Sequence, residues 1–209
     1  MGRKKTLPDQ AVLEATIRVI QRLGPARLTL AEVAREAGLA PATLVQRFGS
    51  KRGLLLSLAE SAAGGAEQCF ARARKRHRSP LRALMAALDE FASLAETPEA
   101  LANNLAFLEI DLTDPDFHRL ALANARATLS GYKALLDDAV RAGELRKCNT
   151  ARLARAISAM AGGSLLSWAI LREGPVKRFL RQDVAVLIGP QRPGIRPNPG
   201  REAGVNAWA

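Results

Sequence analysis

The side chains best suited to recognise another molecule lie between residues 42 and 47. Thr43, Gln46 and Arg47, together with Ala42, follow three- and four-residue spacing, so a helix would bring them to one side. Glutamine can form two hydrogen bonds with adenine, arginine can do so with guanine, and the methyl groups of threonine and alanine can contact thymine. This surface therefore predicts base recognition in the major groove of DNA.

Two short helices would have to position these side chains. The first is predicted to begin at Thr29 and to end at Gly38, and the second to span Pro41 to Phe48, anchored from inside by Leu44 and Phe48. Two short helices around a glycine turn are typical of a helix-turn-helix. The same spacing also fits a two-helix corner whose outer face is simply solvated.

Charge is concentrated in the same part of the chain. The 209 residues include 31 Lys or Arg and 20 Asp or Glu, for a net charge of +11, and residues 1–80 carry +9 of it. Such a basic segment favours a polyanionic partner and hence double-stranded DNA. The densest basic run, residues 72–78, is expected to be solvated instead, because it lies about 36 Å along its helix from the predicted DNA-facing end.

The remainder of the chain is also predicted to be helical, because Ala and Leu dominate and apolar residues recur at three and four. We therefore expect an all-α protein of about nine helices. The predicted organisation is a helix-turn-helix DNA-binding domain over residues 1–68 and a second helical domain over 69–188, to which the family resemblance described below assigns effector binding and dimerisation. Residues 189–209, which are rich in Pro and Gly, are predicted to form a disordered tail.

The basic part contains LTLAEVAREAGLAPATLVQRFGSKRGLLLSLAE and resembles the TetR family of bacterial transcriptional regulators, closely so over residues 8–60. This resemblance implies a homodimer with a helix-turn-helix domain, a fourth connecting helix and a helical ligand domain. It implies that residues 41–47, starting at Pro41, form the recognition helix, and that Thr29 and Lys51 contact the DNA backbone. Val45 departs from the aromatic residue common in the family and would offer methyl groups to a thymine or a sugar.

Candidate effector-binding residues follow in the second domain. Polar side chains interrupt apolar rows within residues 101–112 and 117–135, and buried polar groups need partners. A small-molecule ligand is one such partner, and a neighbouring helix or water is another. The candidates are Phe91, Asn104, Leu108, Asn124, Thr128 and Tyr132. By the same family resemblance, the helices near residues 150–188 would pair with a second copy in a four-helix bundle.

Other classes of function find little support in the sequence. No nucleophile motif, phosphate-binding glycine loop or metal-ligand spacing occurs, so we predict no enzyme activity, no cofactor and no metal. No apolar run approaches the about 20 residues of a membrane span, and we expect a cytoplasmic protein without a membrane partner. The preferred interpretation is a repressor that a small-molecule effector releases from a near-palindromic operator. The alternative is a constitutive architectural protein that binds DNA without sequence preference.

Overall fold

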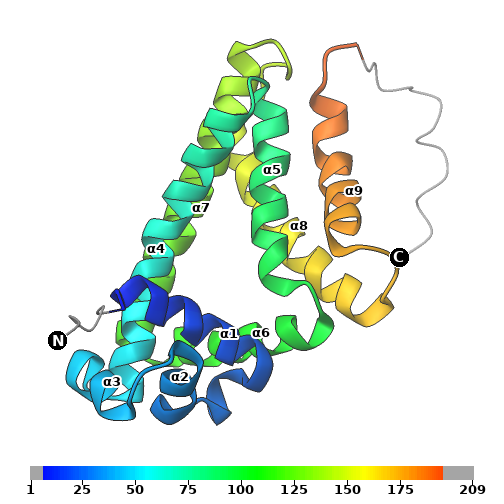
Figure 1. The fold of residues 1–209 in the computed structure, drawn as a ribbon. Coiled ribbons are helices and arrows are strands. Elements are labelled where there is room, and N and C mark those ends of the chain that lie inside the picture. Colours follow the sequence, from blue (N-terminus) through cyan, green and yellow to red (C-terminus); the bar gives the residue numbers. More distant parts are fainter. Residues whose placement is uncertain (1–6, 195–209) are drawn as a thin grey trace.

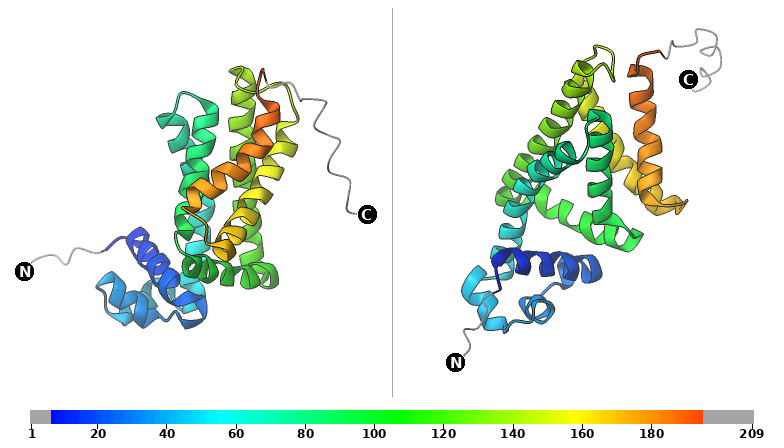
Figure 2. Two further views of the ribbon diagram at one scale, coloured as in Figure 1. Left: turned by 90° about the vertical axis from the view of Figure 1, so that its right-hand side faces the viewer. Right: turned by 45° about the horizontal axis from the view of Figure 1, so that its top comes forward.

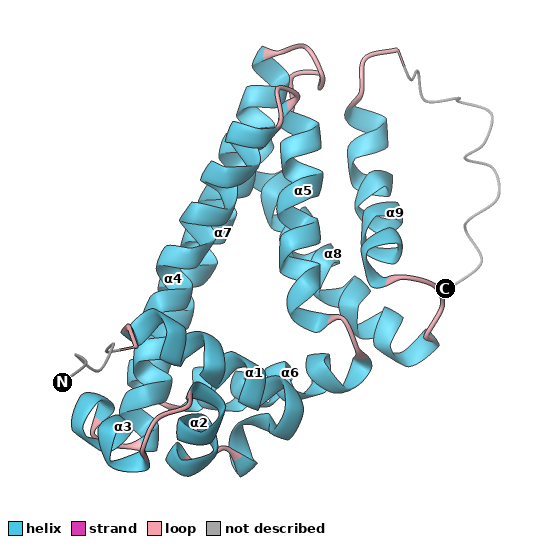
Figure 3. Ribbon diagram, in the orientation of Figure 1, coloured by secondary structure: helices cyan, strands magenta, loops and turns pink. Residues whose placement is uncertain are grey.

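The computed structural model describes residues 7–194. Within this range the chain forms nine α-helices and two short 3₁₀ helices without any strand, which confirms the predicted all-α fold (Figure 3). The helices are α1 (Asp9–Arg27), α2 (Leu30–Ala37), α3 (Pro41–Phe48), α4 (Lys51–Arg76), α5 (Pro80–Ala92), α6 (Pro98–Thr113), α7 (Pro115–Arg141), α8 (Thr150–Leu171) and α9 (Val176–Ile188). The 3₁₀ helices are η1 (Ser93–Ala95) and η2 (Gly189–Gln191).

Local capping accounts for several of these helix starts. The Thr29 hydroxyl accepts the Glu32 N–H at 3.1 Å before α2, and the Asp114 carboxylate accepts the Asp116 N–H at 3.0 Å before α7. Helices α3, α5, α6 and α7 each begin with a proline, whose missing N–H costs nothing in the first turn. Each of the two capping hydrogen bonds joins residues two or three apart, so such bonds can be predicted from the sequence alone.

Helices α1, α2 and α3 pack with the start of α4 around one apolar core. Its buried members include Val12, Val19, Ile20, Leu28, Val33, Ala34, Leu44 and Leu54. Gly38 takes the left-handed conformation at φ 65°, and the Leu39 N–H donates to the Ala34 carbonyl at 2.8 Å. Glycine adopts this conformation without steric cost, so the chain reverses tightly between α2 and α3 as the helix-turn-helix prediction requires.

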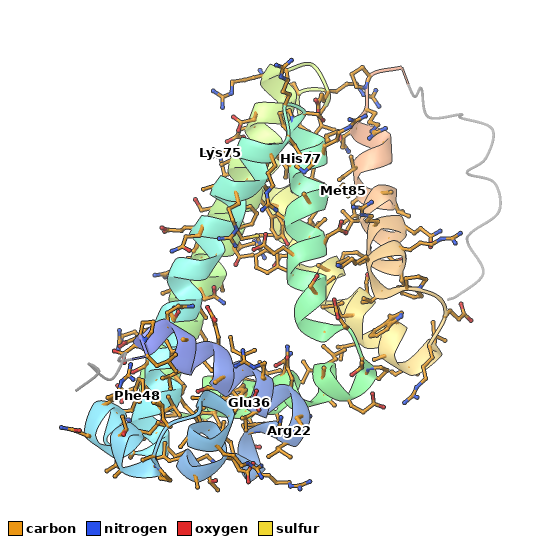
Figure 4. The ribbon with its side chains drawn as sticks, viewed as in Figure 1. Arg22, Glu36, Phe48, Lys75, His77 and Met85 are labelled. Carbon is orange, nitrogen blue, oxygen red and sulfur yellow. The ribbon has the colours of Figure 1, made fainter. Side chains whose placement is uncertain are left out.

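Ion pairs hold α2 against α1 on the surface of this unit. Glu36 of α2 accepts from Arg18 Nε at 2.9 Å and from Arg22 Nη1 at 3.1 Å. Figure 4 shows Arg22 and Glu36 close together at this end of the molecule. The two guanidinium groups, Arg18 first, lower the pKa of the Glu36 carboxyl. These ion pairs connect α1 to α2, the helix against which α3 packs.

Helix α4 leaves the N-terminal unit and runs alongside α7 to the far end of the molecule (Figures 1 and 2). There a second core is built from α4, α5, α7, α8 and α9, with Phe70, Leu84, Leu88, Leu135, Leu136, Ile157, Leu180 and Ile188 among its buried members. The predicted boundary at residue 68 falls inside α4. The two cores are therefore joined by one continuous helix rather than by a linker.

The chain remains ordered beyond the predicted start of the tail at residue 189. Residues Gly189–Gln191 form η2, and the Gln191 carbonyl accepts the Arg146 N–H at 2.7 Å. This contact ties η2 to the loop between α7 and α8, so the prediction of disorder is wrong for these three residues. Residues 195–209 of the predicted tail lie outside the described residues.

Candidate functional site

Helix α3 presents an exposed face at the end of the molecule away from α9 (Figure 1). Leu44 is fully buried and Phe48 packs against the same core, as predicted. On the other side Pro41, Ala42, Val45 and Gln46 are exposed and Thr43 is half-buried. Val45, for example, is 51% exposed. This surface is short and mostly uncharged, and within the described residues it is open to solvent.

Arg47 corrects the sequence-based picture, which placed it on this outward face with Gln46. Its side chain is only 18% exposed, and its Nε donates to Asp9 Oδ1 at 2.7 Å, with Nη2 bonded to the same oxygen. The guanidinium also lies 5.7 Å from the centre of the Phe48 ring. Among residues 7–194, its buried Nη1 has no hydrogen-bond partner. An acidic residue in the first turn of α1 thus draws this arginine away from the recognition face.

The two predicted backbone contacts differ in what they present to DNA. Thr29 is exposed, and its hydroxyl oxygen caps α2. Lys51 instead donates its Nζ to the carbonyl oxygens of Pro25 at 2.7 Å and Ala26 at 3.2 Å. Those carbonyls belong to the last turn after the break at Gly24, where unpaired acceptors attract a cation. In this structure, then, Lys51 binds the protein itself.

The basic run over residues 72–78 lies at the opposite end of α4 from the recognition helix, as its distance along the helix predicted. Figure 4 shows Lys75 and His77 far from Phe48. Arg72 pairs with Glu90, and Arg74 Nη2 lies 2.9 Å from Asp138 Oδ2. Internal ion pairs therefore partly neutralise the run.

A junction of charged side chains joins the start of α4 to the start of α7. Arg52 Nη2 donates to both oxygens of Asp114 at 3.0 Å and to Asp116 Oδ2 at 2.7 Å. Its guanidinium lies 5.7 Å from the centre of the Phe117 ring. Hydrogen bonding from Arg52, and from the backbone N–H groups that Asp114 caps, lowers the pKa of Asp114. Arg52 follows Lys51 directly, so this junction ties α7 to the end of α4 nearest to α3.

A cavity of about 400 Å³, which we call the inner cavity, lies between this junction and the second core. Its walls come from α1, α4, η1 and the helices α5 to α8, and they are mostly apolar. Three phenylalanines contribute rings to it: Phe91, Phe107 and Phe117. Its polar lining side chains are Gln21, Asn104, Asp111 and Asn124. A cavity of this size with a few polar groups is typical of a small-molecule site.

Three of the six predicted ligand-binding residues, Phe91, Asn104 and Asn124, line the inner cavity. Thr128 and Tyr132 do not, because beyond Asn124 helix α7 packs against α4. Tyr132 is instead buried against Phe70, with ring centres 5.1 Å apart, and burial raises the pKa of its hydroxyl. Of the six candidates, Thr128, Tyr132 and Leu108 therefore lie outside the lining of the inner cavity.

Leu108 lies outside the cavity lining for a different reason, which concerns the orientation of the whole of α6. The apolar row of this helix is turned to solvent at Leu105, Leu108 and Leu112, which are 38%, 50% and 66% exposed. The part of α6 that lines the cavity consists of Leu101, Asn104, Phe107 and Asp111. These residues are spaced three and four apart, so helical periodicity offered a signal for them that the stronger leucine pattern concealed.

A second apolar surface lies on α8 and α9. Leu166, Ile170 and Leu171 of α8 are 46%, 80% and 55% exposed, and Val186 of α9 is 68% exposed. Within the described part of the chain, α8 is also long and apolar enough to cross a membrane. Length and composition alone give this result, and 22% of the apolar stretch is buried within the protein.

Comparison with known proteins relates the N-terminal unit, which contains α3, to bacterial regulatory proteins. Residues 12–58 match the family described as bacterial regulatory proteins, tetR family. Over 147 residues the chain is 33% identical to the HTH-type transcriptional regulator BetI of Rhizobium meliloti (strain 1021), a match that covers 65% of this chain and 70% of that protein. The BetI regulator of Agrobacterium fabrum is 32% identical over 145 residues, covering 66% of this chain and 70% of that protein.

Solved structures extend the similarity to the helical second domain. FadR from Bacillus subtilis, solved with stearoyl-CoA, is 16% identical and superposes with a TM-score of 0.66 over 90% of this chain and 100% of that chain. SmeT, the repressor of the Stenotrophomonas maltophilia multidrug efflux pump SmeDEF, is 22% identical with a TM-score of 0.64, over 93% of this chain and 98% of that one. At these identities the likeness establishes the shared fold.

Proposed function

Since the chain belongs to the TetR family of bacterial transcriptional regulators, we propose that it represses transcription from a near-palindromic operator and that a small-molecule effector releases it. The observation that carries this proposal is the exposed face of α3, held outward by the buried Leu44. A regulator of this kind acts where the chromosome is, so we expect it in the cytoplasm.

Base reading in this proposal centres on Gln46. Its exposed amide can bond adenine through two hydrogen bonds, while Ala42 and Val45 offer methyl groups to thymine. Thr29 would bond a phosphate at the start of α2, where helix N-terminal N–H groups also favour an anion. In this proposal, sequence preference therefore comes from a largely neutral face, with Arg47 and Lys51 available only if DNA displaces their present partners.

Homodimerisation is proposed through α8 and α9. An exposed row that contains Leu166, Ile170 and Val186 would be costly in water, and a second copy would cover it. The same covering explains why α8 is apolar enough for a membrane without spanning one. A dimer would place its two recognition helices about 34–36 Å apart, one turn of DNA.

Effector control is proposed to act through the inner cavity. Ile17 and Gln21 of α1 and Leu55 of α4 share its wall with α6 and α7, so an occupant would press directly on the N-terminal unit. The Arg52 junction would carry the resulting shift of α7 to the start of α4. Effector and operator would weaken each other's binding by one common factor, typically about 5–150-fold.

Selection of bound sequences from random duplex DNA tests the proposal. The wild-type chain should enrich a near-palindrome, and Gln46→Ala should lose preference at one position in each half-site, by about 1–3 kcal/mol per base pair. Gln68→Ala on α4 is the matched control, because Gln68 is exposed but belongs neither to α3 nor to the proposed interface helices α8 and α9. Failure to enrich any sequence, with tight binding to all duplexes, would favour the architectural alternative.

A further inference from the structure

The inner cavity carries a charge opposite in sign to that of the protein as a whole. The chain has a net charge of +11, yet among the described residues the one ionisable side chain lining this cavity is the carboxyl of Asp111. No lysine, arginine or histidine of residues 7–194 contributes to its walls. A bound anion would therefore meet a carboxylate and find no cation to balance it.

The aromatic lining points in the same direction. Three aromatic rings reach the cavity, those of Phe91 on α5, Phe107 on α6 and Phe117 on α7. The Asp111 carboxyl comes from α6 as well. Faces of aromatic rings attract cations, most strongly where water is excluded. We infer that the inner cavity takes an apolar cation, an amine or quaternary ammonium on a hydrocarbon body, whose charge is balanced by Asp111. This inference rests on the proposed function only in treating the cavity as the effector site.

The state of the Asp111 carboxyl agrees with this assignment. Burial raises its pKa, while the charge of His118 opposes the shift. His118 is exposed on α7, and its Nδ1 lies 3.2 Å from the Asp111 carbonyl oxygen. Ionisation of a half-buried carboxyl is costly, and the lining supplies no cation of its own. A positively charged ligand in the cavity would therefore relieve a cost that a neutral ligand leaves in place.

Amide groups at the rim complete the recognition of such a ligand. Asn104 and Asn124 face the cavity from α6 and α7, and Gln21 faces it from α1. Their carbonyl oxygens are suited to accept hydrogen bonds from the N–H groups of a protonated amine, whereas a quaternary ammonium, which has no N–H, would interact with them only through its charge. The aliphatic side chains of Ile17, Leu58 and Leu165 then surround the hydrocarbon body.

Calorimetric titration of the full-length protein with three probes that share one body tests the inference. The probes are 4-phenylbutylamine, 4-phenylbutanol and 4-phenylbutyrate, whose head groups are cationic, neutral and anionic. The wild-type protein should bind the amine at least about tenfold more tightly than the alcohol, and the carboxylate more weakly still. Asp111→Asn should abolish the preference for the amine, and Asp111→Glu should retain it.

Glu109→Gln is the matched control, because Glu109 is an exposed carboxylate on α6 that does not line the cavity. It should leave the preference unchanged, and circular dichroism should show all three variants folded. Equal binding of the amine by wild type and Asp111→Asn, tighter binding of the carboxylate, or no binding of the amine would each overturn the inference. Release of the selected operator is scored separately, so an amine that binds through Asp111 without releasing DNA refutes the proposed control and leaves the ligand class standing.

Discussion

Replacement of Gly131 by alanine tests how tightly α7 is packed against α4. A Cβ atom at this position would lie well inside van der Waals contact with the Phe70 ring. That ring is buried at 4% exposure and held between Phe91, 5.8 Å away between centres, and Tyr132, 5.1 Å away. The ring therefore has little room to move away from an added methyl group.

The expected cost follows from two opposing effects. Alanine in place of glycine in a helix interior is normally favourable by about 1 kcal/mol, whereas overpacking a well-filled core costs about 1–3 kcal/mol. Gly64→Ala in α4 isolates the first effect, because an added Cβ there meets nothing within 4 Å. Gly131→Ala should therefore be less stable than Gly64→Ala by about 2 kcal/mol, which corresponds to about 4–8 °C in Tm for a chain of this size.

Thermal and urea unfolding at one protein concentration measure this difference. The common concentration matters because dimerisation would add to the apparent stability of both variants. Phe91 also lines the inner cavity, so displacement of Phe70 should weaken ligand binding in Gly131→Ala alone. If Gly131→Ala proves as stable as Gly64→Ala, the close packing of α7 on α4 is refuted.

Three further predictions concern the charged and apolar surfaces. Asp9→Asn should tighten operator binding by about fivefold, because it frees Arg47 to contact DNA. Glu14→Gln on the same helix should leave operator binding unchanged. If the gain from Asp9→Asn persists in an Arg47→Ala background, Arg47 is not the residue that Asp9 withholds from DNA. Ile170→Glu should give a monomer in light scattering, while Leu108→Glu, also on an exposed apolar row, should remain dimeric. If both variants remain dimeric, the interface lies elsewhere. Because the pKa of Asp114 is lowered from about 3.8, the stabilisation by its ionised form is present above that pH and is lost as the pH falls through the lower folded-state value. Asp114→Asn, which keeps a good N-cap, should therefore lose less stability than wild type between pH 6 and pH 3 in urea unfolding, and an equal loss would show that this carboxylate is not involved.

The predictions that depended on neighbours along the chain were confirmed. Thr29 and Pro41 marked helix starts, and Gly38 marked the turn between α2 and α3, because caps and left-handed turns are satisfied within a few residues. Leu44 was correctly placed in the core because the period of a short helix leaves it one buried side. The resemblance over residues 8–60 likewise rests on contiguous sequence and agrees with the family match over 12–58.

The predictions that depended on distant partners needed the tertiary structure. Arg47 turns toward Asp9, which precedes it by 38 residues, and Lys51 turns toward carbonyls near residue 25. Periodicity assigns a side chain to one side of its helix but does not show which charged or polar group of another helix lies on that side. Likewise α6 has a leucine row and an Asn104–Asp111 row, and only the packing of α1, α7 and α8 against this helix decided which of them lines the cavity. Burial of apolar side chains is favourable against any apolar surface, whether it belongs to the same chain or to a second copy. The sequence alone therefore could not show which of these surfaces an apolar row contacts.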